Sequence, residues 1–306
     1  MKTSVAVLTG GWSSEREVSL MGSRQICDVL RQAGFEVREV DVQCDLRSLI
    51  DALTPAPDVV YNALHGPFGE DGRIQGVLEF LRIPYSHSGV LASSLAMDKP
   101  MAKQVFEAAG ITCPQHIVVS RAEFDAGRRL ELPYVIKPLN EGSSVGVFII
   151  HTEEDLAAAG DQLWKFGDQV MVETFVNGRE LTVSVMGDKA LGVTEIRAGE
   201  GFYDYEAKYT DGRADHLVPA PIHPDAYAAA QDYAVRAHNV LGCRGVSRAD
   251  LMYDDRNGEP GELYLLEVNT QPGMTPLSLV PEQAAHLGIE FGELVRWMVE
   301  NASCDG

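Results

Sequence analysis

The stretch from Ser247 to Leu279 constrains the fold of this chain more than any other part of its sequence. Its residues predict two β-strands, Arg248–Tyr253 and Leu263–Asn269, separated by the turn-rich segment NGEPGE. The Asn257-Gly258 and Pro260-Gly261 pairs in that segment favour tight turns. The stretch therefore predicts a hairpin of two antiparallel strands.

The predicted hairpin carries polar side chains among apolar neighbours. Because side chains alternate along a strand, Arg248 and Asp250 share one face of the first strand. Glu267 and Asn269 share one face of the second strand for the same reason. A register that places Asp250 opposite residue 265 or 267 joins the two polar sets on one face, whereas a slip by one residue separates them.

Asp250, Glu267 and Asn269 offer oxygen ligands without cysteine or histidine, and such a set suits Mg²⁺. Mg²⁺ takes few protein carboxylates and completes its shell with water and phosphate oxygens. The alternative is that these residues form the solvent face of an edge hairpin. The turn at Pro272-Gly273, directly after the second strand, favours a ligand site, because backbone N–H groups in such a turn can face a bound group.

Charge and composition narrow the class of protein. The 306 residues carry a formal net charge of −20, with a pI near 4.7, which disfavours a nucleic-acid partner. A hydrophobic share of 45% is ordinary for a globular chain, and the length suggests two domains with room for a third small lobe. Five scattered cysteines without a C-x-x-C pair predict reduced thiols, a cytoplasmic setting and no structural zinc. We expect neither a signal peptide nor a membrane span, because the apolar runs are too short.

The order of predicted elements divides the chain into three units. Strands at 4–8, 36–40 and 59–64, with helices between them, predict a parallel sheet covered by helices. A helix at 98–110 opens a second unit of alternating strands and helices. A third unit contains the hairpin and a long helix at about 225–241. We therefore expect an α/β protein with units at 1–96, 97–179 and 180–306.

Two loops follow predicted strands of the first unit, GGWSSEREVS at residues 10–19 and HGPFGEDG at residues 65–72. The first lacks the G-x-G-x-x-G pattern of a dinucleotide site, which argues against an oxidoreductase. By spacing alone, Glu15 is an acid in the first turn of a helix, where it complements the helix dipole. His65 stands at the carboxyl end of a strand, where open α/β sheets bind ligands, although a single loop histidine is more often structural.

A third loop, NEGSSVG at residues 140–146, follows a predicted strand that ends at Lys137. Its glycines and serines suit a surface hairpin. They suit equally a lid whose backbone N–H groups cover phosphates, with Lys137 as a charge beside them. The pattern G-x-x-x-x-G-K-[ST] is absent, so the chain is not a P-loop enzyme.

The chain resembles the D-alanine–D-alanine ligase family of the ATP-grasp superfamily in several separate motifs, over essentially its whole length. The motifs are GGWSSEREVS, LHGPFGEDG, EGSSVG, RAD and EVNTQPGMT. The resemblance implies the ATP-grasp fold, with an N-terminal parallel-sheet domain, a small central α+β lobe and a C-terminal α+β domain with an antiparallel sheet.

The resemblance also implies roles for individual residues. The implied catalytic groups are Glu15, Ser143, Tyr209, Arg248 and the N–H of Gly273. The implied substrate contacts are His65, Lys208, Ser278 and Leu279. The implied nucleotide contacts are Lys99, Lys137, Glu173, Phe175, Val176 and Glu180. The implied metal ligands are Asp250, Glu267 and Asn269, with Glu267 between two ions.

The implied activity is the ATP-dependent ligation of two D-alanines through D-alanyl phosphate, for peptidoglycan synthesis. ATP and two Mg²⁺ ions, with Mn²⁺ as a substitute, are the implied cofactors, and the implied assembly is a cytoplasmic homodimer. Tyr209 favours an amine as the second nucleophile, since relatives that form D-alanyl-D-lactate commonly carry Phe there. The alternatives are a ligase for D-lactate or other amino acids, and a nucleotide-binding sensor without turnover.

Overall fold

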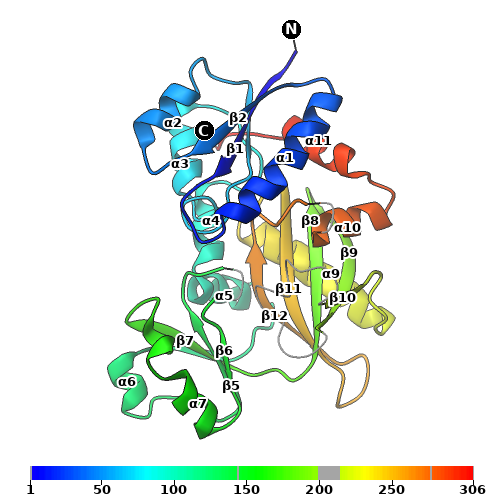
Figure 1. Cartoon of the computed structure of the whole chain (residues 1–306). Helices are drawn as coiled ribbons and strands as arrows, with labels where there is room; N and C mark the ends of the chain where they lie inside the picture. The colour runs from blue at the N-terminus through cyan, green and yellow to red at the C-terminus, as the bar shows by residue number, and fades with distance from the viewer. Residues whose placement is uncertain (1, 143–144, 199–213, 276–277, 306) are drawn as a thin grey trace.

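The structure is a computed structural model that describes residues 2–142, 145–198, 214–275 and 278–305. The described residues form three β-sheets with helices packed on them (Figure 1). This arrangement confirms the predicted α/β class, with one parallel and two antiparallel sheets. None of the described helices has the length and apolar character needed to cross a membrane.

The N-terminal sheet is parallel, and its strand order is β2-β1-β3. Its strands are β1 (Ser4–Gly10), β2 (Glu36–Val42) and β3 (Val59–Asn62). The helices of this unit are α1 (Arg16–Gln32), α2 (Leu46–Ala52), α3 (Arg73–Leu81) and α4 (Val90–Met97). The middle of the central strand β1, from Val5 to Leu8, is apolar because both of its faces are covered: Val5 and Val7 belong to one hydrophobic cluster, whereas Ala6 and Leu8 belong to another.

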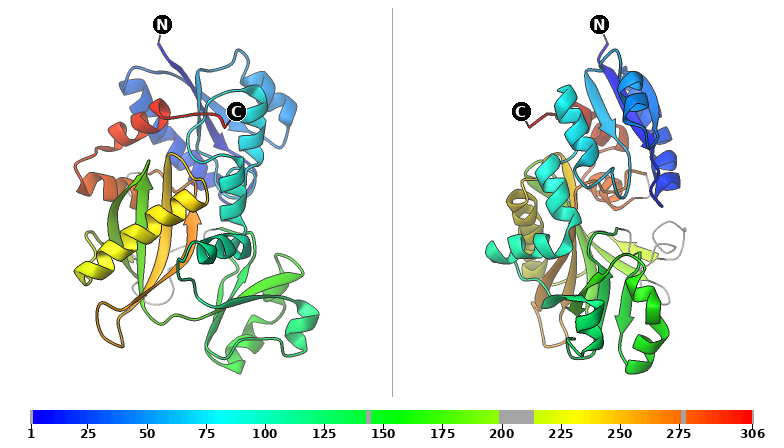
Figure 2. Two further views of the ribbon diagram at one scale, coloured as in Figure 1. Left: turned by 180° about the vertical axis from the view of Figure 1, so that it is seen from behind. Right: turned by 90° about the vertical axis from the view of Figure 1, so that its left-hand side faces the viewer.

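The end of the chain returns to this N-terminal sheet, as Figure 2 shows for the red helices beside the blue strands. Helices α10 (Leu279–His286) and α11 (Phe291–Glu300) join the same hydrophobic cluster as β1 and α1. Beyond α11, Ser303 pairs with Tyr85 in an isolated antiparallel bridge. One hydrophobic cluster contains residues from both sides of the predicted unit limits at residues 96 and 179. These limits therefore stay a prediction.

The central lobe contains a four-stranded antiparallel sheet of order β4-β7-β5-β6. Its strands are β4 (His116–Ser120), β5 (Tyr134–Pro138), β6 (Phe148–Ile150) and β7 (Gln169–Thr174). Helices α6 (Arg121–Asp125) and α7 (Glu153–Ala159) and the 3₁₀ helix η1 (Gly160–Trp164) complete it. Both α-helices begin with a capping box, at Ser120 and at Thr152, which satisfies N–H groups that the helix itself leaves unpaired.

The largest sheet is antiparallel, with strand order β10-β9-β8-β11-β12. Its strands are β8 (Arg179–Met186), β9 (Lys189–Ala198), β10 (Ala214–Leu217), β11 (Val246–Asp254) and β12 (Glu262–Asn269). Helix α9 (Pro224–Val240) lies across one face of this sheet (Figure 2, left). Helix α5 (Lys99–Ala108) joins α9 and this sheet in one hydrophobic cluster, through Ala102 and Phe106. The face opposite α9 is left for the site.

The register of the β11–β12 hairpin agrees with the prediction. Asp250 lies opposite Glu267, and Arg248 lies opposite Asn269, so the two polar sets share one face of the sheet. The pairing then shifts, because the next residue, Leu251, lies opposite residue 265 and not 266. This β-bulge leaves one extra residue, Leu266, in β12, a feature that the sequence did not predict.

Candidate active site

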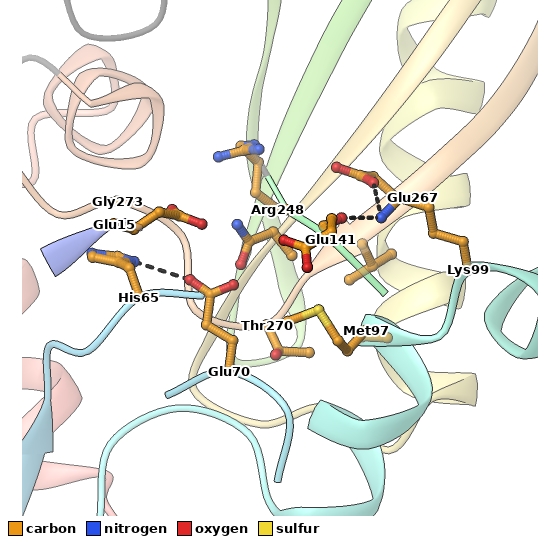
Figure 3. Close-up of a pocket in the computed structure, with 14 residues that line it drawn as sticks. Glu15, His65, Glu70, Met97, Lys99, Glu141, Arg248, Glu267, Thr270 and Gly273 are labelled. Atoms are coloured by element: carbon orange, nitrogen blue, oxygen red, sulfur yellow. Dashed lines mark hydrogen bonds and ion pairs between the residues drawn. The ribbon is translucent and has the colours of Figure 1, made fainter. Parts of the chain in front are cut away.

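The first of two pockets, the reaction pocket, lies where loops of the N-terminal unit meet the hairpin (Figure 3). The loop after β1, the loop after β3, the start of α5, the lid motif and the end of β12 all contribute to its walls. The predicted site residues that line it are Glu15, His65, Lys99, Arg248, Glu267, Asn269 and Gly273. Segments that are far apart in the sequence therefore converge on one polar cavity.

Asp250 is held between strands on both sides. It lies opposite Thr182 of β8, whose hydroxyl donates to Asp250 Oδ1 at 2.7 Å. The guanidinium of Arg248 donates to both carboxylate oxygens, at 2.8 Å and 2.7 Å. Asp250 is only 9% exposed, so the bidentate pair compensates a charge that has lost most of its water.

Glu267 differs from Asp250 in its surroundings. Its side chain is 34% exposed, and among the described residues it forms an ion pair with Lys99, whose Nζ lies 3.7 Å from Oε2 (Figure 3). Lys99 is fixed in the first turn of α5, which Asp98 caps through the Met101 N–H at 3.0 Å. The Lys99 ammonium also donates to the carbonyl of Glu141 in the lid motif. Lys99 therefore links the metal-ligand candidates to the lid.

The donor set on this face fits Mg²⁺. Asp250 and Glu267 supply carboxylates from directly opposed positions, and Asn269 supplies an amide oxygen two residues further along β12. The Asn269 Oδ1 accepts the Gln271 N–H at 2.8 Å, and this hydrogen bond fixes the orientation of the side-chain amide. The oxygen keeps a second lone pair that can bind a metal ion. A hard oxygen-only set without sulfur or nitrogen matches the preference of Mg²⁺.

The opposite wall of the reaction pocket is a cluster of two acids and a histidine. Glu15, His65 and Glu70 offer ligand atoms that all lie within 4.8 Å of one another. The His65 Nδ1 lies 3.0 Å from Glu70 Oε1 (Figure 3). Burial acts to lower the pKa of His65, but the hydrogen bond and charge of Glu70, with the charge of Glu15, outweigh burial and raise it. The cluster is suited to a positively charged group.

The loop after β12 closes the pocket between these two walls. Gly273 lines it, and a Cβ built there would lie 3.1 Å from the Ser278 hydroxyl. Ser278 Oγ accepts the Thr275 N–H at 3.1 Å, and Leu279 begins α10. The loop is tied to the N-terminal unit by Gln271, whose Oε1 accepts from Asn62 Nδ2 at 2.7 Å.

The second pocket, the nucleotide pocket, lies between the central lobe and the largest sheet and has a volume of about 690 Å³. Its size is in the range of small-molecule sites. Five of the predicted nucleotide contacts line it, and they are Lys137, Glu173, Phe175, Val176 and Glu180. Met252 and the bulge residue Leu266 contribute apolar surface from β11 and β12.

A buried charge triad lies at the inner end of the nucleotide pocket. Glu173 is 1% exposed, and each of its carboxylate oxygens lies 2.6 Å from a lysine, Lys137 on one side and Lys103 on the other. Lys103 itself is fully buried. Burial would raise the pKa of Glu173, but the charges of Lys137 and Lys103 lower it to about 2. The triad keeps one net positive charge beside the pocket.

Some predicted residues cannot be placed, and some site residues were not predicted. Ser143, Lys208 and Tyr209 lie outside the described residues. The structure adds Glu70, Lys103, Glu141, Thr182 and Gln271. Lys103 could have been found, because it lies four residues after Lys99 and so shares a face of the same helix. Glu70, Glu141 and Gln271 lie within the quoted motifs, whereas the sequence carries no signal for Thr182.

Comparison with known proteins identifies the family. A family model described as "D-ala D-ala ligase C-terminus" matches residues 105–300, and one described as "D-ala D-ala ligase N-terminus" matches residues 47–88. The D-alanine–D-alanine ligase of Acidiphilium cryptum is 59% identical over 300 residues, which are 98% of each chain. That of Rhodospirillum rubrum is 57% identical over 307 residues and the full length of both chains.

Solved structures agree with the sequence matches. The D-alanine–D-alanine ligase of Bacillus anthracis in complex with ATP superimposes with a TM-score of 0.84 at 32% identity, over 98% of this chain and 97% of that one. A D-Ala:D-Ser ligase from Enterococcus faecalis gives a TM-score of 0.81 at 28% identity, over 98% and 99% of the two chains. On the sequence matches and this shared ATP-grasp fold, the chain belongs to the D-alanine–D-alanine ligase family.

Proposed function

We propose that this protein uses ATP to join two D-alanine molecules into D-alanyl-D-alanine through a D-alanyl phosphate intermediate. The observation that carries the proposal is the position of β12 between the two pockets. Glu267 and Asn269 line the reaction pocket, and Leu266, directly before them, lines the nucleotide pocket. A nucleotide in the second pocket would therefore extend its phosphates toward the carboxylates of the first.

The acid wall of the reaction pocket is the proposed site of the first D-alanine. Glu15 and Glu70 present negative charge to the substrate ammonium, and His65, held by Glu70 at 3.0 Å, orients the bound molecule. An ammonium fixed there leaves the substrate carboxylate free to attack the γ-phosphate. Most of the rate enhancement would come from this positioning and from stabilisation of charge.

The proposed metal ligands are Asp250, Glu267 and Asn269, which together would hold two Mg²⁺ ions. Bound Mg²⁺, or Mn²⁺ in its place, would neutralise phosphate oxygens. Lys99 and Lys137 add point charges at the two ends of the phosphate path. The lid motif at 140–146 would cover the phosphates and exclude water, which would otherwise hydrolyse the acyl phosphate.

In the second step the amine of the second D-alanine attacks the carbonyl carbon of the acyl phosphate, which forms the amide bond, breaks the bond from that carbon to the phosphate oxygen, and releases phosphate and a proton. We propose that Arg248 and the Gly273 N–H stabilise the developing oxyanion, because both line the reaction pocket. Ser278 and the Leu279 N–H would hold the carboxylate of the second substrate at the start of α10. Ser143, Lys208 and Tyr209 complete the proposed site.

The setting of the reaction is also a proposal. We propose a cytoplasmic homodimer whose product feeds peptidoglycan synthesis, since amide formation with ATP and free D-amino acids is cytoplasmic chemistry. The scattered free cysteines are consistent with a reducing compartment. Sedimentation equilibrium tests the assembly: a single species of monomer mass at micromolar concentration would contradict the homodimer.

A second candidate concerns the second substrate only. The relative from Enterococcus faecalis is a D-Ala:D-Ser ligase with the same fold, so D-serine is a specific competitor for the second position. D-Lactate is a further competitor, which Tyr209 disfavours. Comparing D-alanine, D-serine and D-lactate as second substrates, with product identified by mass spectrometry, separates the three.

Phosphate release from Mg·ATP tests the reaction class. We expect release with D-alanine, with equimolar dipeptide, and neither release nor product with L-alanine or without an amino acid. Release that is independent of any amino acid would indicate an ATPase and contradict the proposal. Tight ATP binding without release under every condition would favour the sensor interpretation.

A further inference from the structure

The side chains of Trp12, Phe68 and Arg73 form a cluster that we call the aromatic clamp. We propose that this clamp sets the affinity of the protein for the first D-alanine. The pair acts through two loops that carry Glu15 and His65, and the inference therefore rests on the role proposed above for the acid wall. Trp12 and Phe68 are positioning residues in this proposal, because neither lines the reaction pocket.

The clamp joins the loop after β1 to the loop after β3. The rings of Trp12 and Phe68 have centroids 4.6 Å apart with planes inclined at 45°, and the Arg73 guanidinium lies 4.4 Å from the centre of the Phe68 ring. Aromatic pairs and cation–π contacts of this kind attract beyond the area they bury. Both rings are partly exposed, Trp12 at 42% and Phe68 at 37%, so core packing does not account for their contact.

The backbone of Phe68 is strained. Its φ is +73°, in the left-handed region where a bulky side chain is disfavoured and glycine is at ease. The Phe68 N–H donates to Asp71 Oδ2 at 2.9 Å, and Arg73 lies 3.0 Å from the same oxygen. A strained residue persists only where its surroundings hold it, and such residues gather at functional sites. A glycine here would satisfy the backbone but could not contact Trp12.

The spacing of the two loops determines the place of the Glu15 carboxylate. A Cβ built on Gly66 would lie 3.2 Å from Glu15 Oε1 and 3.2 Å from Ser13 Oγ, so the two loops are in close contact there. The Ser13 hydroxyl donates to the carbonyl of His65 at 2.7 Å and accepts the Glu15 N–H at 3.2 Å. A change in loop spacing therefore moves Glu15 relative to His65, which would misplace the proposed ammonium contact at Glu15 and the histidine that orients the substrate.

The test substitutes each ring and measures substrate saturation separately for D-alanine and ATP. Phe68→Gly removes the ring and also relieves the positive φ, so we expect an unchanged or raised Tm. We expect about a tenfold rise in KM for the first D-alanine, less than a twofold change in KM for ATP, and little change in kcat. Trp12→Ala should reproduce the rise, and the double variant should be no worse than either single variant, because the two rings act as one unit.

Conservative and matched variants separate a clamp from general damage. Phe68→Tyr keeps the stacked ring and should retain the wild-type KM. Phe80→Ala removes a ring that is 95% exposed on α3 and should leave both KM values unchanged. An unchanged first-site KM in Phe68→Gly and Trp12→Ala would overturn the proposal, as would a parallel rise in KM for ATP with a lower Tm. A wild-type protein without D-alanine-dependent phosphate release would instead refute the proposed function.

Discussion

Two carboxylates, Glu173 in the nucleotide pocket and Glu267 in the reaction pocket, have opposite surroundings. Glu173 is 1% exposed, with each oxygen 2.6 Å from a lysine. The Glu267 side chain is 34% exposed, and its ion pair among the described residues is Lys99 at 3.7 Å. The same residue type is therefore fully compensated in one cluster and open to a further cation in the other.

The difference separates a structural charge from a chemical one. Each oxygen of Glu173 contacts a lysine, so a metal ion could bind Glu173 only by displacing one of the two lysines, and losing a buried partner is costly. A half-open carboxylate keeps water and lone pairs available, so it can take a cation at little cost to the fold. We therefore expect substitution of Lys103, the triad member that does not line the nucleotide pocket, to affect stability, and substitution of Glu267 to affect turnover.

Glu267→Gln should have the largest effect of the predicted changes, and this effect should be on catalysis and not on stability. Loss of the carboxylate removes a proposed metal ligand, so we expect kcat to fall by about a thousandfold. The free energy of unfolding, measured by urea titration, should change by less than about 1 kcal/mol, because the side chain is partly solvated. Glu262→Gln, an exposed acid on the same strand, is the matched control and should keep full activity. Normal turnover by a folded Glu267→Gln protein would sink the metal assignment.

Lys103→Met should show the converse pattern. The variant leaves a buried carboxylate with one of its two cations, and we expect unfolding to become easier by about 3 kcal/mol. This value is at the low end for a broken buried pair because Lys137 still contacts Glu173. The double variant Lys103→Met/Glu173→Gln should recover part of the loss, since it removes the uncompensated anion. No change in the urea midpoint of Lys103→Met would mean that the triad does not stabilise the fold.

Acid should weaken the buried cluster in a defined pH range. The pKa of Glu173 is lowered from 4.5 to about 2, so its contribution is fully present above pH 4.5 and is lost as the pH falls toward 2. Between neutral pH and pH 3.5 this one group should remove on the order of 1 kcal/mol of unfolding free energy. Urea titrations of the wild type and of Glu173→Gln at pH 5.5 and pH 3.5 give the loss of unfolding free energy of each protein between the two pH values. The contribution of Glu173 is the difference between these two losses. Equal dependences would show that Glu173 is not held ionised.

Thr182→Val should have the smallest effect of the four. It removes the hydroxyl that donates to Asp250 at 2.7 Å, without changing the size of the side chain. We expect about a fivefold fall in kcat and a loss of about 1 kcal/mol in stability. Thr194 lies on the neighbouring strand β9, and its buried hydroxyl accepts from Gln283 Nε2 of α10. Thr194→Val removes this hydroxyl and should cost similar stability and leave kcat unchanged. Equal kcat values for the two variants would show that Thr182 does not orient Asp250.

The sequence predicted the parts of the fold that depend on local pattern. The alternation of Arg248, Asp250, Glu267 and Asn269 with apolar residues led to the hairpin and its polar face, and the register was confirmed. The motifs led to the family, which the comparisons confirmed. The roles of individual site residues stay predictions, although the structure brings most of the described ones into two pockets.

What the sequence could not supply comes from contacts between distant segments. Thr182 gains its partner Asp250 from a neighbouring strand, and Lys103 gains Glu173 from a strand far along the chain, and no spacing in the sequence encodes such contacts. The β-bulge after Asp250 places Leu266 on the wall of the nucleotide pocket beside Glu267, against the simple alternation of β12. The sequence by itself therefore determined the elements, the polar face and the family, because these follow from local periodicity and motif. Only the tertiary structure decided which carboxylate is buried between two lysines and which stays open, because burial and charge pairing depend on how distant segments pack.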